Sequence, residues 1–218
     1  MFNKDGTARF AMTLYALKPR FQALLRPVVT GLARRGVTAN QVTLAAAFGS
    51  VAFGGIVAVN ADTHWLFLLL PAWFLARMAL NAIDGMLARE FGQKSRLGAY
   101  LNEISDVVSD AALTLPFALV APFDPRWVGA VVFLAALSEF AGVLGPAVGA
   151  SRRYDGPMGK SDRALVFGGL GLAVGLFGAL PSWAGWAMPA LALLLALTVV
   201  NRVRGGLKEP EGPTPPRA

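Results

Sequence analysis

Carboxylate and carboxamide side chains between residues 81 and 110 have the spacing of a site for a hard metal ion. Asn81 and Asp84 are three residues apart, and Asn102, Asp106 and Asp110 follow one another at intervals of four. On helices, each of these spacings places the side chains on one face. Oxygen ligands without Cys or His favour a divalent ion such as magnesium, manganese or calcium. The sequence therefore predicts two polar helix faces that converge on such an ion.

The residues between these two faces are suited to a bound phosphate. Gly85 and Ala88 are small, so a bulky group can approach the first helix closely. Gly98 opens the second helix in the same way, one turn before Asn102. Arg89 offers the planar guanidinium fork that matches phosphate oxygens. Together with the acids, these residues indicate a pyrophosphate bridged by metal.

The composition assigns these helices to a membrane protein. Of the 218 residues, 55% are hydrophobic and 15% are charged, and the mean hydropathy is +0.53. A soluble domain carries about a quarter charged residues. The absence of cysteine excludes disulfides, thiolate zinc sites, iron–sulfur clusters and cysteine nucleophiles. The single histidine, His64, argues against a His-based metal centre or triad.

The hydrophobic segments predict an all-α polytopic protein, since a helix needs about 20 apolar residues to span a bilayer. Six segments qualify, and they cover residues 41–60, 63–84, 98–121, 127–150, 163–181 and 183–202. We expect a cytoplasmic arm over 1–40, a six-helix domain over 41–205 and a flexible tail over 206–218.

The arm contains an amphipathic segment over residues 10–35, which predicts a helix lying in the plane of the lipid headgroups. Its apolar residues recur at helical spacing and are Phe10, Leu14, Leu17, Phe21, Leu24, Leu25 and Val28.

Basic residues predict the orientation of the six spans. The net charge is +7, and every Lys and Arg except Arg77 and Arg126 lies in the arm, in the loops near 89–96 and 152–163, or close to the C-terminus. Cytoplasmic loops of membrane proteins carry such an excess. Both termini are therefore expected in the cytoplasm, with the polar helix faces opening at the cytoplasmic side of an inner membrane.

Residues 81–106 resemble the motif of the CDP-alcohol phosphotransferase (CDP-alcohol phosphatidyltransferase) family. That motif is Asp-x-x-Asp-Gly-x-x-Ala-Arg, eight residues, then Gly-x-x-x-Asp-x-x-x-Asp. Six of its eight fixed positions match with the full spacing, as Asn81-x-x-Asp84-Gly85-x-x-Ala88-Arg89, eight residues, Gly98-x-x-x-Asn102-x-x-x-Asp106. A second family feature, Asn-x-x-Thr at the start of the first span, is present as Asn40 and Thr43.

The resemblance implies a transferase of phospholipid biosynthesis. Such enzymes move a phosphatidyl or substituted phosphate group from a CDP-activated donor, commonly CDP-diacylglycerol, to a hydroxyl acceptor and release CMP. They use Mg²⁺ or Mn²⁺ and are often homodimers. Their partners are membrane lipids and not nucleic acid. By position in the motif, Asp106 is the expected base. The expected metal ligands are Asp84, Asp106, Asn81 and Asn102. The expected CDP-binding residues are Asn40, Thr43, Gly85, Ala88, Arg89, Ser95 and Gly98.

Asn81 and Asn102 depart from the family pattern, which has aspartate at both positions. Asparagine keeps an oxygen ligand but loses the charge. Three interpretations stay open. The site binds metal more weakly, with Glu103 or Asp110 compensating; it binds a CDP-lipid without turnover; or it accepts an unusual donor whose own charge makes up the deficit. A small channel or transporter is the alternative of a different class, and it would place polar groups on several helices near the midplane.

The loop near 152–163 is the second candidate region. It carries Arg152, Arg153, Lys160 and Arg163 close to the expected site. One interpretation is a pocket for an anionic acceptor, since several relatives use basic residues here for phosphorylated acceptors. The other is the ordinary positive charge of a cytoplasmic loop. The sequence does not name the acceptor alcohol.

Overall fold

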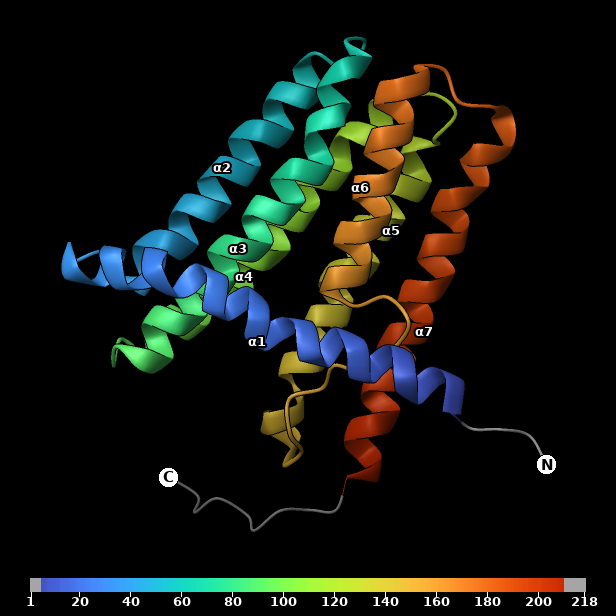
Figure 1. Cartoon of the computed structure of the whole chain (residues 1–218). Helices are drawn as coiled ribbons and strands as arrows, with labels where there is room; N and C mark the ends of the chain where they lie inside the picture. Colours follow the sequence, from blue (N-terminus) through green and yellow to red (C-terminus); the bar gives the residue numbers. More distant parts are fainter. Residues whose placement is uncertain (1–4, 210–218) are drawn as a thin grey trace. The chain divides into compact units, whose positions relative to one another are not determined.

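The computed structural model describes residues 5–209, with side chains from residue 20 onward, and these residues form helices and no strands (Figure 1). The α-helices are α1 (Asp5–Arg34), α2 (Ala39–Val59), α3 (Leu69–Glu90), α4 (Arg96–Thr114), α5 (Pro125–Val143), α6 (Lys160–Phe177) and α7 (Ala187–Lys208). Short 3-10 helices are η1 (His64–Leu68), η2 (Leu115–Leu119), η3 (Gly145–Val148) and η4 (Ser182–Trp186). The prediction of an all-α protein is confirmed.

Four helical stretches are long and apolar enough to cross a membrane. They are Ala39–Val59, His64–Glu90, Pro125–Val143 and Ser182–Lys208, and they match four of the six predicted spans. The predicted spans 98–121 and 163–181 fall on α4 and α6, whose charged residues leave them no sufficiently long apolar stretch. These charges are Arg96, Glu103, Asp106 and Asp110 on α4, and Lys160, Asp162 and Arg163 on α6. The chain is therefore a membrane protein by its apolar helices, and the count of six spans stays a prediction.

The chain packs as two compact units. The first consists of Met1–Ala46 and Ala76–Asn102, and the second of Ala47–Leu75 and Glu103–Ala218. The predicted arm, domain and tail follow other criteria and stay predictions. Helix α7 extends to Lys208, so the first residues of the predicted tail are helical, and residues 210–218 lie outside the described part of the chain.

The first unit has a small apolar core in which α1 takes part. Val29 of α1 is fully buried, and it packs with Val42 of α2 and with Ile83, Met86 and Leu87 of α3. Helix α1 is therefore held to the ends of α2 and α3 by apolar packing, beyond the interfacial role expected from the sequence.

The side of α1 that faces away from the core of the first unit exposes apolar residues, as an interfacial helix would. Phe21, Leu24 and Val28 are exposed, whereas Leu25 is partly buried against the core of the first unit. The predicted residues Phe10, Leu14 and Leu17 have side chains outside the described part of the chain. The position of α1 in the headgroup region stays a prediction.

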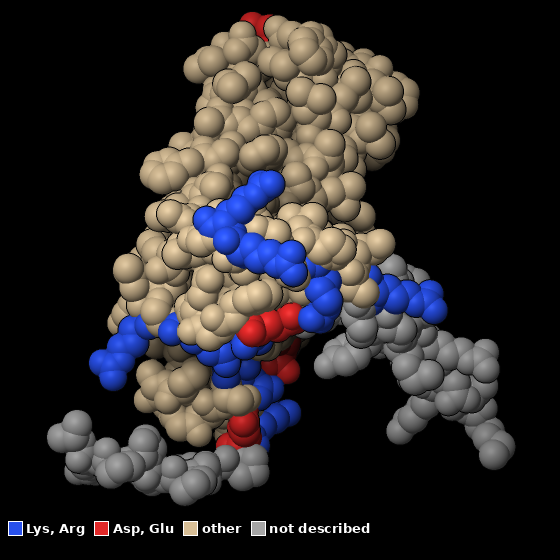
Figure 2. Space-filling view, turned by 60° about the vertical axis from the view of Figure 1, so that its left-hand side comes forward, with Lys and Arg blue, Asp and Glu red and all other residues tan. Residues whose placement is uncertain are grey.

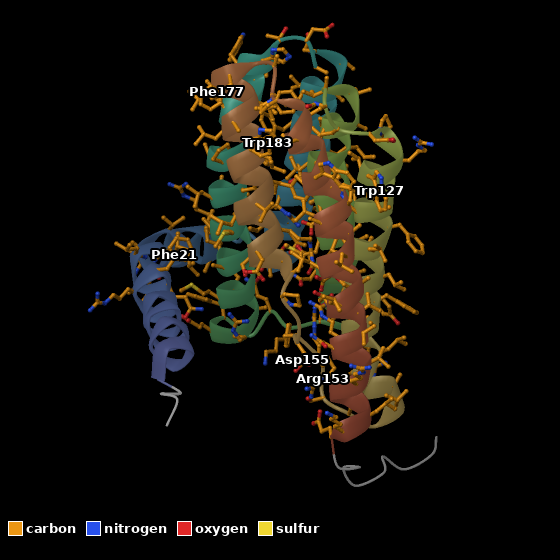
Figure 3. All side chains as sticks on the ribbon, turned by 90° about the vertical axis from the view of Figure 1, so that its right-hand side faces the viewer. Phe21, Trp127, Arg153, Asp155, Phe177 and Trp183 are labelled. Atoms are coloured by element: carbon orange, nitrogen blue, oxygen red, sulfur yellow. The ribbon has the colours of Figure 1, made fainter. Side chains whose placement is uncertain are left out.

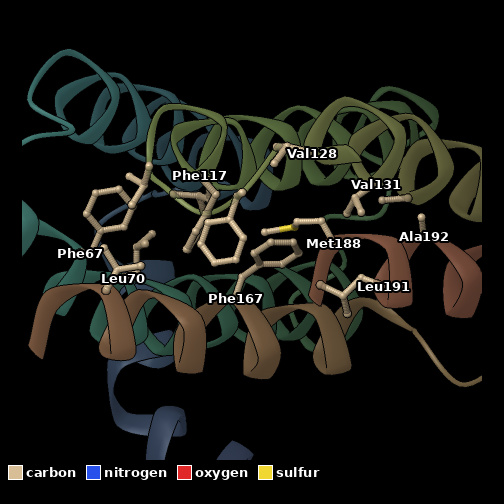
Figure 4. Packing of buried hydrophobic residues seen from close by; sticks show 14 of the residues in the cluster. Phe67, Leu70, Phe117, Val128, Val131, Phe167, Met188, Leu191 and Ala192 are labelled. Carbon is tan, nitrogen blue, oxygen red and sulfur yellow. The ribbon is translucent and has the colours of Figure 1, made fainter. Parts of the chain in front are cut away.

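Aromatic rings organise the core of the second unit (Figure 4). The Phe117 ring meets the edges or faces of three others, with ring centroids 5.4 Å from Phe67, 5.8 Å from Phe123 and 5.4 Å from Phe167. Helices α5 and α7 pack along each other, and Val131 and Met188 are among the residues buried between the elements of this unit. Such interdigitation fixes the helices that carry the charged residues described below.

The surface agrees with a membrane environment. Most of the face in Figure 2 is neither acidic nor basic, and large apolar side chains such as Leu165, Phe177 and Trp186 are exposed. Within the second unit, Trp127 and Trp183 lie toward the end opposite Arg153 and Asp155 (Figure 3). Aromatic residues at one end and ion pairs at the other are typical of a helix bundle that spans a bilayer.

Candidate active site

In the first unit, a predicted CDP-binding residue of α2 and a predicted metal ligand of α3 meet in a hydrogen bond. Asp84 is 5% exposed, and one of its carboxylate oxygens accepts a hydrogen bond of 2.8 Å from the Thr43 hydroxyl. The same hydroxyl lies 3.1 Å from the carbonyl oxygen of Ala39. A buried carboxylate needs such donors. Thr43 therefore positions the one charged residue that the motif places on this face of α3.

The start of α2 is fixed by reciprocal capping bonds. The Thr38 hydroxyl accepts from the Gln41 amide at 3.2 Å, and the Gln41 side chain accepts from the Thr38 amide at 2.9 Å. This is a capping box, which satisfies two amides of the first turn. The Ala39 amide also donates to the Gln93 side chain at 2.7 Å. The segment between α3 and α4 is thereby tied to the start of α2, where Asn40 and Thr43 lie.

Three more predicted donor residues come together at the start of α4. The Ser95 hydroxyl accepts a bond of 2.9 Å from the Gly98 amide, as an N-cap does. A Cβ atom at residue 98 would lie 2.8 Å from the side-chain oxygen of Asn40 and 3.0 Å from the Ser95 hydroxyl. Glycine is therefore required for this close approach of Asn40, Ser95 and Gly98, which gathers polar atoms beside the α4 N-terminus.

Gly85 makes room for the side chain of Arg89. A Cβ atom at residue 85 would lie 2.9 and 3.0 Å from the two terminal nitrogens of Arg89, which is exposed and one turn further along α3. The guanidinium thus lies along the space that the sequence assigned to a bulky ligand. Ala88 packs against the core of the first unit.

The assignment of metal ligands stays a prediction, which the chemistry of the side chains fits. Asn81 and Asn102 are half-buried on α3 and α4, and with Asp84 and Asp106 they offer only oxygen donors. This donor set fits a hard divalent ion. Among residues 5–209, however, no group of three or more His, Cys, Asp or Glu residues could hold a metal.

In the second unit, three acids on one face of α4 each pair with a base. Glu103, Asp106 and Asp110 are spaced by three and four residues, so they share that face. The partners are Arg152 for Glu103, Lys160 for Asp106 and Arg163 for Asp110. The Arg163 bonds to Asp110 measure 2.6 and 2.8 Å. We call this set of three pairs the α4 ladder. Its bases are three of the four residues that the sequence offered as acceptor ligands.

A deeper network extends the α4 ladder to α5 and α7. Arg163 also donates to Glu139 at 2.8 Å, and Arg202 donates to the other Glu139 oxygen at 3.3 Å and to the carbonyl of Ser138. The side chains of Arg163 and Arg202 are 5% and 2% exposed. Ion pairs this deep need complementary partners, since each unpaired charge would be costly. Glu139 provides them for both arginines.

Arg153, the fourth predicted acceptor ligand, is also matched by acids. It donates to Asp155 at 2.8 and 3.0 Å and to Glu209 at 2.6 Å. Arg153 and Asp155 lie beside each other in Figure 3. Hydrogen bonding from Arg153 lowers the pKa of Asp155, and hydrogen bonds from Ser151 and then Arg153 lower the pKa of Glu209. Both acids are therefore held in their charged form.

Sequence reasoning named Glu103 and Asp110 as acids that compensate for the missing aspartates. In the structure each of these acids forms an ion pair with an arginine. Their compensating role in metal binding stays a prediction. The residues of these ion pairs that sequence reasoning missed are Arg202, Asp155 and Glu209. Glu139 had a usable signal, because an acid within an apolar span must find a partner.

Comparison with known proteins places the chain in a well-defined group. A sequence model of the family described as CDP-alcohol phosphatidyltransferase matches residues 36–200. The chain is 47% identical over 199 residues to the inner membrane protein YnbA of Escherichia coli (strain K12), covering 90% of this chain and 97% of that protein. It is 28% identical over 186 residues to a phosphatidylinositol phosphate synthase of Mycolicibacterium smegmatis, covering 83% of this chain and 82% of the relative.

Solved structures show the same fold. The crystal structure of Mycobacterium tuberculosis phosphatidylinositol phosphate synthase with CDP-DAG bound superposes with a TM-score of 0.70 at 23% identity, covering 84% of this chain and 94% of the other. The structure of that synthase with manganese and citrate gives a TM-score of 0.68 at 24% identity, with 84% and 89% coverage.

Proposed function

The chain belongs to the CDP-alcohol phosphatidyltransferase family, and from this premise we propose that it transfers a phosphatidyl group from CDP-diacylglycerol to a hydroxyl acceptor and releases CMP. It is a membrane transferase of phospholipid biosynthesis. The observation that carries the proposal is the hydrogen bond between Thr43 and buried Asp84. It joins the two sequence features of the family, which lie 41 residues apart in the chain.

The donor side of the proposed site uses residues of the first unit. Asn40, Ser95 and Gly98 gather their polar atoms within a few ångströms of one another, and they supply neutral hydrogen bonds for the cytidine and phosphate groups. Arg89 is exposed and carries a charge that a pyrophosphate would attract. With Gly85 beside it, its guanidinium can turn from the helix toward a ligand.

Asn81, Asp84, Asn102 and Asp106 would hold a divalent ion, Mg²⁺ or Mn²⁺. The manganese-containing structure of the Mycobacterium tuberculosis synthase supports a divalent ion in this family. When bound, the ion would neutralise charge on the pyrophosphate and on the departing CMP. The two asparagines lower the negative charge of the site, and the donor pyrophosphate would restore part of it.

Asp106 is the proposed base. Its side chain is 14% exposed and contacts the ammonium group of Lys160, which keeps the carboxylate in one orientation. Asp106 takes the proton from the acceptor hydroxyl, and the hydroxyl oxygen attacks the β-phosphorus of the donor. The bond from that phosphorus to the CMP oxygen breaks, and CMP leaves with the bonding pair. Arg152, Arg153, Lys160 and Arg163 then belong to the acceptor side of the site.

We place this site at the cytoplasmic face of the inner membrane, with six spans, both termini inside and α1 at the interface. The basic loops support this orientation. Because the chain has no cysteine, single cysteines at Asp62 and Asp124 can be labelled with an impermeant reagent. Labelling from outside the cell is expected at both positions, and labelling only after permeabilisation would reverse the orientation.

A screen for lipid products tests the proposed function. Purified protein receives radiolabelled CDP-diacylglycerol, magnesium or manganese, and a panel of alcohols, and released CMP is compared with new lipid. We expect equal amounts of both with at least one acceptor. CDP-lipid binding without CMP release for every acceptor would instead show a binding protein, the interpretation that the asparagines at 81 and 102 leave open. No binding and no CMP release would contradict both.

A further inference from the structure

The α4 ladder determines what an acceptor meets next to the proposed base. The acceptor hydroxyl must reach Asp106, and the residues around Asp106 in the second unit are therefore the acceptor's neighbours. Glu103 lies three residues before Asp106 and Asp110 four residues after it on the same helix face. Arg152, Lys160 and Arg163 are the bases on that side. The remainder of the acceptor molecule must fit among these six side chains.

Charge in this region is balanced within the chain. Five cations, namely Arg152, Arg153, Lys160, Arg163 and Arg202, form ion pairs with six carboxylates, namely Glu103, Asp106, Asp110, Glu139, Asp155 and Glu209. Negative charges outnumber positive ones by one in this set. The remaining basic residues near the end of α7, Arg204 and Lys208, are exposed. The loop that looks strongly basic in the sequence is thus part of a neutral to slightly acidic cluster.

A phosphorylated acceptor would be poorly matched to this cluster. Its phosphate dianion would compete with a carboxylate for each guanidinium, and a displaced carboxylate would be left half-buried without its partner. Its charge would also face Glu103 and Asp110 on either side of Asp106. An uncharged alcohol avoids both costs, because its hydroxyl groups can donate to the carboxylates already present.

We infer that the acceptor of this enzyme is an uncharged polyol rather than a phosphorylated alcohol, and that the ion pairs of the α4 ladder determine this choice. The inference rests on the proposed function and names its acceptor class. It selects between the two interpretations of the basic loop: the loop residues position the α4 acids and do not bind an anion.

Matched pairs of acceptors test the inference by turnover. The parent protein with CDP-diacylglycerol is assayed for CMP release with glycerol against glycerol 3-phosphate and with inositol against inositol 1-phosphate. We expect kcat/KM to be at least about tenfold higher for the uncharged member of the better pair. A preference for the phosphorylated member would overturn the inference while leaving the proposed function intact. Absence of CMP release with all four acceptors would count against the proposed function.

A binding measurement tests the same inference without turnover. Glu103→Gln removes the partner of Arg152, whose guanidinium remains against the Tyr154 ring, 5.0 Å from its centroid. Glycerol 3-phosphate is titrated calorimetrically into the parent and the variant. We expect the variant to bind it at least about tenfold more tightly, as one new charge-assisted hydrogen bond would give.

Two further variants make this measurement decisive. Glu209→Gln removes one of the two acids that pair with Arg153 and leaves Asp155 in place, so it lowers the negative charge of the cluster by one and should also raise the affinity if Glu103→Gln fails to fold. Asp124→Asn is the matched control, because it removes the partner of Arg126 in an exposed ion pair at the start of α5, and it should leave the affinity unchanged. Equal, tight binding of glycerol 3-phosphate to the parent and to both test variants would overturn the inference.

Discussion

The candidate site residues of the first unit are neutral apart from Asp84 and Arg89, whereas those of the second unit form ion pairs. The Thr43 hydroxyl donates to the buried acid Asp84, and the amide of Asn40 and the hydroxyl of Ser95 lie close together beside Gly98. In the second unit, by contrast, an acid of α4 such as Asp110 meets its own base directly. The difference matches the two proposed substrates. A pyrophosphate donor brings charge and needs an environment with little negative charge of its own.

Self-neutralised ion pairs serve a different purpose in the second unit. The acid and the base of each pair attract each other within the protein. The pairs therefore fix the positions of helices rather than attract an anion. Arg163 illustrates this, because it joins Asp110 of α4 to Glu139 of α5 from its own position on α6. The pairs can therefore hold Asp106 in place while leaving acceptor binding to hydrogen bonds.

The largest expected effect comes from removing the base in the second unit. Asp106→Asn keeps the shape of the side chain but cannot take the acceptor proton. We expect CMP release to fall by about 10²- to 10⁴-fold, the usual contribution of a general base. The assay is CMP release with the preferred acceptor, and calorimetric titration of CDP-lipid checks that donor binding is retained. Full activity in this variant would remove Asp106 from the mechanism.

The free energy of unfolding should depend strongly on the buried ion pairs of the second unit. Glu139→Gln would leave Arg163 and Arg202 without the charge that they share, and both are buried. We expect a loss of about 3–5 kcal/mol in the free energy of unfolding, as is usual when one member of a buried ion pair is removed. Unfolding in detergent measures it. Asp124→Asn, in an exposed pair, is the control and should have little effect. Equal changes in the free energy of unfolding of the two variants would show that the burial of an ion pair does not determine its contribution to stability.

The elements of both regions could be predicted from the sequence, but the ion pairs of the second could not. Apolar segments and the family motif are local patterns, so they predicted the helices and candidate site residues such as Thr43 and Asp84. The pair of Glu139 with Arg202 joins residues 63 positions apart, and no helical period connects them. Glu103 was considered only as a substitute metal ligand, because the position of Arg152 depends on how the loop folds back onto α4.

A smaller effect is expected on the donor side. Arg89→Ala removes a charge-assisted contact to the pyrophosphate, worth about 1.5–3 kcal/mol, or about ten- to a hundredfold in the affinity for CDP-lipid. Gly85→Leu fills the space beside Arg89 and should weaken the same binding. Arg26→Ala is the control, since Arg26 forms an exposed pair with Glu90 in the same unit. Unchanged CDP-lipid affinity in both donor variants would place the donor elsewhere.

The smallest expected effect concerns the two asparagines, which leave the candidate metal ligands of the first unit with little negative charge. Asn81→Asp combined with Asn102→Asp would restore the family pattern and should raise the affinity for manganese by about tenfold in the absence of donor. A carboxylate offsets the dehydration of a divalent ion better than a carboxamide does, while water around these half-buried positions screens part of the gain. Calorimetric titration of manganese measures it, with and without CDP-lipid.

The donor should reduce this difference, because its pyrophosphate supplies the charge that the parent protein lacks. The parent is therefore expected to gain more manganese affinity from CDP-lipid than the double variant does. Asp62→Asn, at an exposed position in the turn before η1, is the control for a change between acid and amide. Identical manganese affinities of parent and double variant, with and without donor, would show that residues 81 and 102 do not contact the ion. The asparagines at 81 and 102 would then serve the packing of the first unit and have no role in metal binding.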